Sequence, residues 1–215
     1  CFMAGFTSWA DTRNSSNALN NLTDRTYGGF GGVGHSARGG GTYYIRRTFL
    51  QFDTSSIAVA PSSATLKVYG YTWDSDDIIA VRSTHNTSSL ATTDFPELYG
   101  ASTALGNSDG SGAGTLAGVS GLTYSAEIAT WSTSGYNDIV LNATARADMA
   151  SLNILTIAII SYDNDYLDNV IADNTNVVSG GYYSDESGTS KDPYIDYTAG
   201  SAAVTYDSIF FGTNF

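Results

Sequence analysis

The sequence predicts an all-β fold, specifically an antiparallel two-sheet jelly-roll-like sandwich with one short helix. Aromatic residues make up 13% of the 215 residues and Tyr alone occurs 15 times, whereas only 14% of residues are charged. This composition favours strands over helices. Apolar residues alternate with a period of two almost everywhere, and Gly-rich and Ser-rich segments separate the short runs. Strands that do not alternate with helices are typical of packed antiparallel sheets.

The first 42 residues are rich in Asn, Ser and Gly, and we expect turns and short edge strands there rather than a helix. The clearest strand follows at 43–52, where side chains alternate between two faces. Pro61 interrupts the chain, and alternation at 66–70 predicts a second strand. A third strand is expected at 78–83, after an acidic turn.

The second half of the chain contains the single predicted helix, at 142–153. Asn142 or Thr144 can cap it, and Ala145 and Met149 are spaced as on one helix face. Residues 86–123 are Ser-, Thr- and Gly-rich and predict long loops with short strands. The remaining strands are expected at 136–141, 155–162, 181–184 and 194–197. The apolar 155–162 strand is expected to be buried on both faces or to lie in mid-sheet.

We expect a single domain over residues 1–198, with a Gly- and Asn-rich N-terminal part at 1–42. Residues 199–215 form an apolar extension, and the chain also starts with an apolar segment at 1–6. Apolar ends outside a closed fold often add a strand to an exposed edge. The sequence therefore predicts that both ends dock on neighbouring copies or on other subunits of an assembly.

Three segments in order resemble the DNRLRE-type, carbohydrate-binding-module-like β-sandwich family, in its phage and environmental branch. They are RRTFLQFDTSSIAVAPSSATLKVYGY, WSTSGYNDIVLNATARADMAS and YYSDESGTSKDPYIDYT, and they span roughly residues 45 to 198. The resemblance implies a jelly-roll sandwich without catalysis. It also implies a place in secreted bacterial polysaccharide-acting proteins, cell-surface adhesins or virion proteins of tailed phages. The motif residues to which we give a structural role are Arg47, Asp53, Glu186, Asp192 and Pro193.

Physical chemistry explains these motif residues without a catalytic role. Asp53, followed by Thr and Ser residues, is expected to form a turn by bonding its own backbone. Arg46 or Arg47 lies on an otherwise apolar strand and is expected to pair with a carboxylate such as Asp53 or Glu186. Pro193 fits the first position of an edge strand, where no ladder donor is lost.

Several function classes are disfavoured by composition and motif. A net charge of -12 argues against nucleic-acid binding and anionic membranes. No nucleophile elbow lies between a strand and a helix, and the Gly-rich 28–41 segment lacks the apolar helix of a phosphate-binding loop. His35 and His85 have no histidine partner at zinc-ligand spacing, so no zinc site is expected. The sequence predicts no enzyme.

Ca²⁺ is the candidate cofactor that the sequence indicates. Two loops carry closely spaced hard oxygen ligands, which suit Ca²⁺, although neither has the Gly and the distal Glu of an EF-hand. Solvated acidic loops are the alternative interpretation in so acidic a chain. The candidate ligands are Asp163, Asp165, Asp168, Asp74 and Asp76, with Asp163 and Asp165 preferred.

Sugar binding would use exposed aromatic rings, which stack on apolar surfaces. The candidate platforms are Trp73, Tyr71, Trp9 and Tyr99, with Trp131 expected in the core instead. The alternative for Trp73 is a place at the end of the fold as part of the core.

The first functional hypothesis is a non-catalytic structural or adhesive module on the surface of an extracellular assembly, such as a phage head decoration, fibre or spike. The second is a carbohydrate-binding module of a secreted bacterial protein. The third is a lipid-anchored cell-surface or filament subunit, with the lipid on Cys1. All three predict an extracellular or virion-surface location.

Overall fold

The structure is a computed structural model, and it describes residues 2–18, 20–21, 27–36, 41–73, 76–86, 91–101, 114–183 and 190–201. The predicted all-β class is confirmed, and every pair of neighbouring strands is antiparallel. The strands are β1 (Phe2–Phe6), β2 (Asn20–Asn21), β3 (Tyr27–Ser36), β4 (Thr42–Asp53), β5 (Ser63–Trp73), β6 (Ile78–Arg82), β7 (Tyr136–Val140), β8 (Ile154–Ser161), β9 (Asn176–Tyr182) and β10 (Tyr194–Thr198).

The strands join into one curled sheet in the order β10-β5-β9-β3-β4-β1-β2, with β7 paired to β5, and β8 paired to β4 and β6. Two long strands hold this network together because each changes partners along its length. β4 pairs with β1 and β3 first and with β8 from Thr48 onward. β5 pairs with β7 and β10, and then with β9 from Gly70. Division into two separate jelly-roll sheets stays a prediction, because these shared strands connect the layers.

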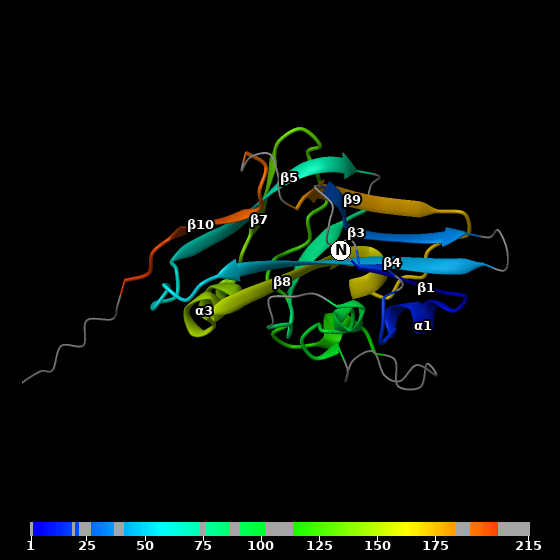
Figure 1. Ribbon diagram of the computed structural model, residues 1–215, viewed down its shortest axis with the longest axis horizontal. Coiled ribbons are helices and arrows are strands. Elements are labelled where there is room, and N and C mark those ends of the chain that lie inside the picture. Colours follow the sequence, from blue (N-terminus) through cyan, green and yellow to red (C-terminus); the bar gives the residue numbers. More distant parts are fainter. Residues whose placement is uncertain are drawn as a thin grey trace, which may run out of the picture.

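The core lies on both faces of β8, which runs through the middle of the molecule (Figure 1). Leu155, Ile157 and Ile159 belong to one buried cluster, which also holds apolar residues of β5 and β7. Ala158 and Ile160 belong to a second cluster with residues of β4 and β6. A strand buried on both faces explains why this segment of the sequence is apolar without alternation.

The predicted helix is confirmed as α3 (Ala143–Ser151). Asn142 is its N-cap, and the side-chain oxygen of Asn142 accepts a hydrogen bond from the backbone N–H of Ala145 at 3.1 Å. That bond satisfies one of the donors that a helix start leaves open. The strands predicted around 43–52 and 78–83 are also found, as β4 and β6.

The prediction for the N-terminal part is wrong in two respects. A short helix, α1 (Trp9–Arg13), follows β1, and its N-cap is Ser8. The Gly-rich β3 is no edge strand, because it lies between β4 and β9. A Cβ on Gly31 would lie 2.9 Å from Ile78 Cγ2 and 3.0 Å from the carbonyl carbon of Ile160. The absence of a side chain at Gly31 lets β3 approach the buried strands closely. Strand propensity does not predict this role of glycine.

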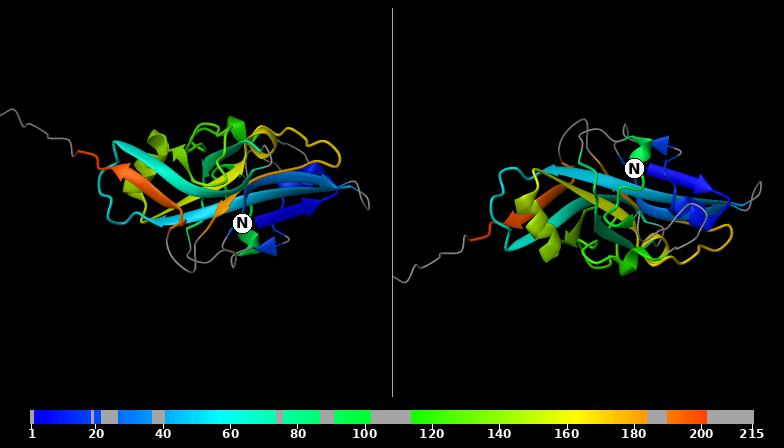
Figure 2. Two further views of the ribbon diagram at one scale, coloured as in Figure 1. Left: turned by 90° about the horizontal axis from the view of Figure 1, so that it is seen from above. Right: turned by 90° about the horizontal axis from the view of Figure 1, so that it is seen from below.

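The apolar start of the chain also has a place within the fold, since β1 pairs with β4 on one side and with β2 on the other. The helices α1 and α3 lie at opposite ends of the elongated molecule (Figure 2). Three short turns complete the described elements: η1 (Thr92–Asp94), η2 (Leu116–Gly118) and the π-helical η3 (Tyr162–Tyr166). In the described part of the chain, no helix has the length and apolar character needed to traverse a bilayer.

Candidate functional site

Five tyrosines form a continuous row over the outer surface of β5, β7, β9 and β10, and we call this row the tyrosine face. On β5 the inward positions carry small or apolar buried residues, and the outward positions carry polar and aromatic ones. This alternation places successive aromatic rings on one side of the strand. The members of the tyrosine face are Tyr69, Tyr71, Tyr136, Tyr182 and Tyr194.

The rings of the tyrosine face contact one another edge to face. Tyr69 lies at the centre, with its ring centroid 5.3 Å from that of Tyr136 and 5.6 Å from that of Tyr182. Tyr194 continues the row at 5.3 Å from Tyr136, and Tyr71 continues it at 5.9 Å from Tyr182. Edge-to-face contacts of this kind are favourable, so the row holds its arrangement without a bound partner.

Polar contacts fix the central rings of the tyrosine face. The Tyr69 hydroxyl donates to the carbonyl of Ser134 at 2.8 Å, and the Tyr136 hydroxyl donates to the carbonyl of Ser190 at 2.9 Å. The Lys191 ammonium lies 4.2 Å from the Tyr182 ring centroid and 5.2 Å from that of Tyr69. Tyr71 and Tyr194 stay 43% and 45% exposed, so the outer rings of the row are open to a ligand.

The predicted sugar platforms divide between the surface and the interior. Tyr71 belongs to the tyrosine face, and Trp73 is 40% exposed two residues further along β5. Trp9 does not meet the expectation, because it is buried and its indole N–H donates to Asp168 at 2.9 Å. Tyr99 is partly exposed, and the Arg82 guanidinium lies 4.4 Å from its ring centroid. Trp131 is buried in the core, as expected.

Two of the five candidate calcium ligands lie in a buried ion-pair network instead. Asp165, fully buried on η3, receives a bidentate pair from Arg47, with Nε to Oδ2 at 2.7 Å and Nη2 to Oδ1 at 2.8 Å. Arg13 contacts Asp168 at 2.6 Å and donates to the backbone carbonyl of Asp165 at 2.8 Å. Arg47 and Arg13 pair with these two carboxylates and balance charge that a cation would otherwise neutralise, and Ca²⁺ binding by Asp165 and Asp168 stays a prediction.

The Arg47 partner also differs from the one expected at the sequence level. Arg47 is fully buried on β4, and its remaining donors reach the carbonyls of Phe95 and Arg13, both at 3.1 Å. The Phe95 ring lies 4.3 Å below the guanidinium. Asp53 instead forms the predicted turn, accepting bonds from the backbone N–H and the hydroxyl of Ser55 at 3.0 and 2.6 Å.

The remaining motif residues fall at the end of the chain. The carbonyl of Asp192 accepts a bond from the Tyr136 hydroxyl at 3.2 Å. Pro193 directly precedes β10, which ends the strand order next to β5, so it has the predicted edge position. Glu186, Cys1 and the 202–215 part of the extension lie outside the described residues.

Two other calcium candidates, Asp76 and Asp163, line one cavity of about 380 Å³ although 86 residues separate them in the chain. Asp76 is buried, and its Oδ1 accepts a bond from the Ser161 hydroxyl at 2.7 Å. The pKa of Asp76 is raised to about 7, mainly by burial and also by the charges of Asp77 and Asp163, while the hydrogen bond from Ser161 opposes the shift. Asp74 lies outside the described residues.

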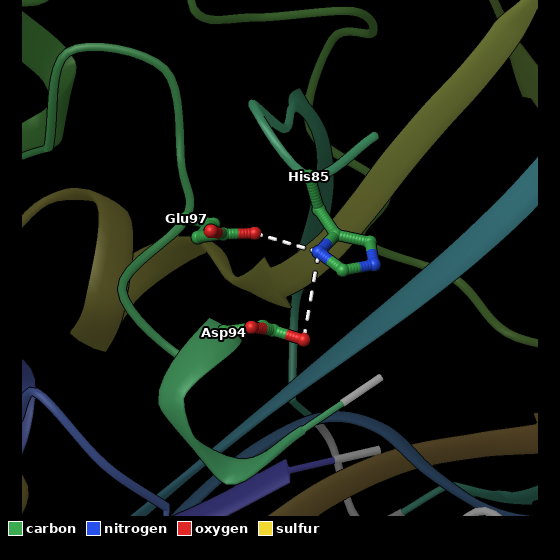
Figure 3. Close-up of side chains that lie close together, drawn as sticks. All are labelled: His85, Asp94 and Glu97. Atoms are coloured by element: carbon green, nitrogen blue, oxygen red, sulfur yellow. Dashed lines mark hydrogen bonds and ion pairs between the residues drawn. The ribbon is translucent and has the colours of Figure 1, made fainter. Parts of the chain in front are cut away.

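His85, Asp94 and Glu97 form a group that the sequence analysis missed (Figure 3). The Nδ1 atom of buried His85 lies 2.6 Å from Glu97 Oε2 and 3.5 Å from Asp94 Oδ2. Asp94 Oδ2 also accepts a bond from the backbone N–H of Ala91 at 2.6 Å. The group can exist as a charged pair or hold a metal through one nitrogen and two carboxylates. The spacing of zinc-binding histidine pairs does not identify this group, because the group contains one histidine. The spacing His-x8-Asp-x2-Glu would identify it.

Comparison of the chain with models of known protein families, with curated proteins and with solved structures found no match. The resemblance to the DNRLRE-type family therefore stays a prediction.

Proposed function

We propose that this chain is a non-catalytic adhesive module that binds glycan chains through the tyrosine face. The setting that we propose is the exposed surface of an extracellular assembly, such as a virion, as the sequence resemblance implies. The observation that supports the proposal is the ordered row of partly exposed rings across β5, β7, β9 and β10. Apolar surface of this kind marks a binding site when it is contiguous.

Aromatic rings and polar groups alternate along the outer surface of β5 and β7, which suits a sugar. Tyr69 lies opposite Tyr136, and two residues further Lys67 lies opposite Asp138. The Lys67 ammonium contacts both carboxylate oxygens of Asp138 at 2.7 Å in an exposed pair. A pyranose presents an apolar C–H face and a rim of hydroxyls, so rings can stack on the face while the charged pair bonds the rim.

The absence of catalysis is part of the proposal, and the ion pairs and hydrogen bonds of two buried aspartates support it. Asp165 is held by Arg47, and Asp148 accepts bonds from Arg82 and from the Tyr124 hydroxyl. A general acid or base has to be within reach of substrate with its proton free to move. These groups instead neutralise one another inside the fold.

A protein surface is the second candidate partner for the tyrosine face. Tyr and Trp are enriched among the residues that contribute most to protein–protein interfaces, and Trp73 extends the row of exposed rings. Docking on another subunit of the assembly would use the same rings. Glycan binding is favoured because the exposed Lys67–Asp138 pair adds hydrogen-bonding groups beside them.

The test is affinity electrophoresis of the full chain in gels that contain each of a panel of soluble polysaccharides, with a glycan array to find the sugar class. Tyr71→Ala combined with Trp73→Ala should weaken retention about tenfold, because two stacking surfaces are lost. Tyr99→Ala is the matched control, since this ring is 37% exposed but contacts no ring of the tyrosine face. It should leave retention unchanged.

Two results would contradict the proposal. The first is no retention of the wild-type chain on any polysaccharide or array glycan. The second is equal weakening by the Tyr99 control and by the double variant. Elution of the wild-type chain as an oligomer that the double variant cannot form would indicate the protein partner instead.

A further inference from the structure

We propose that the cavity lined by Asp76 and Asp163 is a binding site for a divalent cation with oxygen ligands, for which Ca²⁺ is the natural probe. The cavity lies where the start of β6, the turn η3 and the loop before β9 meet. None of its lining residues belongs to the tyrosine face. Cation binding in this cavity therefore does not depend on glycan binding at the tyrosine face.

The first support is a carboxylate oxygen of Asp76 that is buried and unpartnered. Asp76 is only 3% exposed, and the Ser161 hydroxyl bonds its Oδ1. The Ser179 hydroxyl bonds its backbone carbonyl at 2.6 Å, so both the main chain and one carboxylate oxygen are held in place. The second oxygen, Oδ2, has no hydrogen-bond partner among the described residues. A buried acceptor in this state costs free energy unless a ligand satisfies it.

The second support is the set of oxygen-bearing side chains that line the same cavity as Asp76. Asp163 contributes a second carboxylate, while Asn164 and Asn169 contribute amide groups. Two bonds hold this loop in shape: the Asn164 side-chain N–H₂ donates to the Asn169 carbonyl at 2.6 Å, and the Asn169 backbone N–H donates to the Asp163 carbonyl at 3.1 Å. Donors on a preformed loop lose less entropy when they bind a cation.

The third support is local charge. Among the described residues, no Lys, Arg or His forms an ion pair with Asp76 or Asp163. The negative charges of Asp77 and Asp165 raise the pKa of the Asp76 carboxyl. Arg46 interacts electrostatically with Asp76 but forms no ion pair with it. Asp165 itself is matched by Arg47. The carboxylates of the cavity are left with uncompensated charge, which a divalent cation would neutralise.

The donor set indicates the kind of cation. Carboxylates and amides without nitrogen or sulfur donors suit Ca²⁺ and Mg²⁺ rather than Zn²⁺. An open cavity of about 380 Å³ leaves room for the water molecules that complete the coordination. Two carboxylates with neutral oxygens resemble the weaker class of calcium sites, so we expect a dissociation constant on the order of 0.1 to 1 mM.

The experiment is calorimetric titration of CaCl₂ into the chelator-treated full chain, repeated with MgCl₂ and ZnCl₂. Asp163→Asn should weaken Ca²⁺ binding at least tenfold, because one of the two carboxylates that line the cavity is lost. Asp163 is exposed, so we expect the variant to fold. Asp76→Asn should abolish the binding. The matched control is Asp173→Asn, which makes the same charge change on an exposed residue of the loop before β9. This residue pairs with His35 and does not line the cavity. It should change the dissociation constant less than twofold.

Three results would overturn the inference. One is no heat of Ca²⁺ binding by the wild-type chain at 10 mM. Another is equal loss in the Asp163 and Asp173 variants, which would show general screening of negative charge. The last is loss of Ca²⁺ binding in Glu97→Gln but not in Asp163→Asn, since the cation would then belong to the group of His85, Asp94 and Glu97. Thermal unfolding of each variant without Ca²⁺ identifies any that fail to fold.

Discussion

Two buried aspartates on neighbouring elements, Asp165 of η3 and Asp76 just before β6, are neutralised to different extents. Asp165 is 0% exposed and accepts two short bonds from Arg47, with Arg13 beside it. Asp76 is 3% exposed and has one hydroxyl partner for its two oxygens. The first charge is balanced within the chain and serves the structure. The second requires a proton or a cation from outside, and this makes it the better candidate for binding.

The largest effect on stability should come from removing Arg47, which balances the buried charge of Asp165. Arg47→Met should lower the free energy of unfolding by about 3–5 kcal/mol, because Asp165 would remain buried without its bidentate partner. Urea unfolding followed by tryptophan fluorescence measures this change. A loss below about 1 kcal/mol would mean that Arg13 alone neutralises Asp165, and the contrast with Asp76 would disappear.

Measuring stability at several pH values would test directly whether the charge of Asp76 is unbalanced. In buffer with chelator, the folded chain keeps the Asp76 carboxyl protonated up to about pH 7, its raised pKa, whereas the unfolded chain releases that proton near pH 4. The folded state binds more protons between these values, so this group makes stability fall as pH rises through that window. Urea unfolding at pH 5 and pH 8 should show a smaller difference in Asp76→Asn than in the wild-type chain.

The control for the pH series is Asp196→Asn on β10, whose carboxylate is exposed. It should keep the wild-type difference between pH 5 and pH 8. If Asp76→Asn keeps it as well, the carboxyl of Asp76 is ionised in the folded chain across the whole window, and water or Arg46 compensates its charge.

The smallest effect on stability should come from breaking the exposed ion pair of Lys67 and Asp138. Both side chains are partly in water, and exposed ion pairs contribute little to stability. Lys67→Met should leave the midpoint of urea unfolding nearly unchanged, while it weakens retention on a polysaccharide that the wild-type chain binds. A large loss of stability would show that this pair belongs to the structural network rather than to the binding surface.

Local patterns in the sequence predicted the elements whose signals lie within a few residues. The alternation at 43–52 identified β4, Asn142 identified the start of α3, and Asp53 identified its own turn. Each of these depends on contacts between near neighbours in the chain, which side-chain period and capping chemistry describe well. The glycines of β3 were misjudged because their value comes from a close approach to strands far away in sequence.

The partners of charged residues depended on topology instead. Arg46 or Arg47 was expected to pair with a carboxylate such as Asp53 or Glu186. Arg47 does pair with a carboxylate, but it is that of Asp165, 118 positions away. Asp76 and Asp163 are separate acidic loops in the sequence and meet in one cavity only because β6 and β8 are paired strands.

The sequence by itself therefore determined the all-β class, the helix α3 and the presence of acidic loops, since these follow from composition and short periods. Only the tertiary structure decided which carboxylates are neutralised and which are not, because the electrostatic environment of a buried charge depends on groups that folding brings together from distant positions.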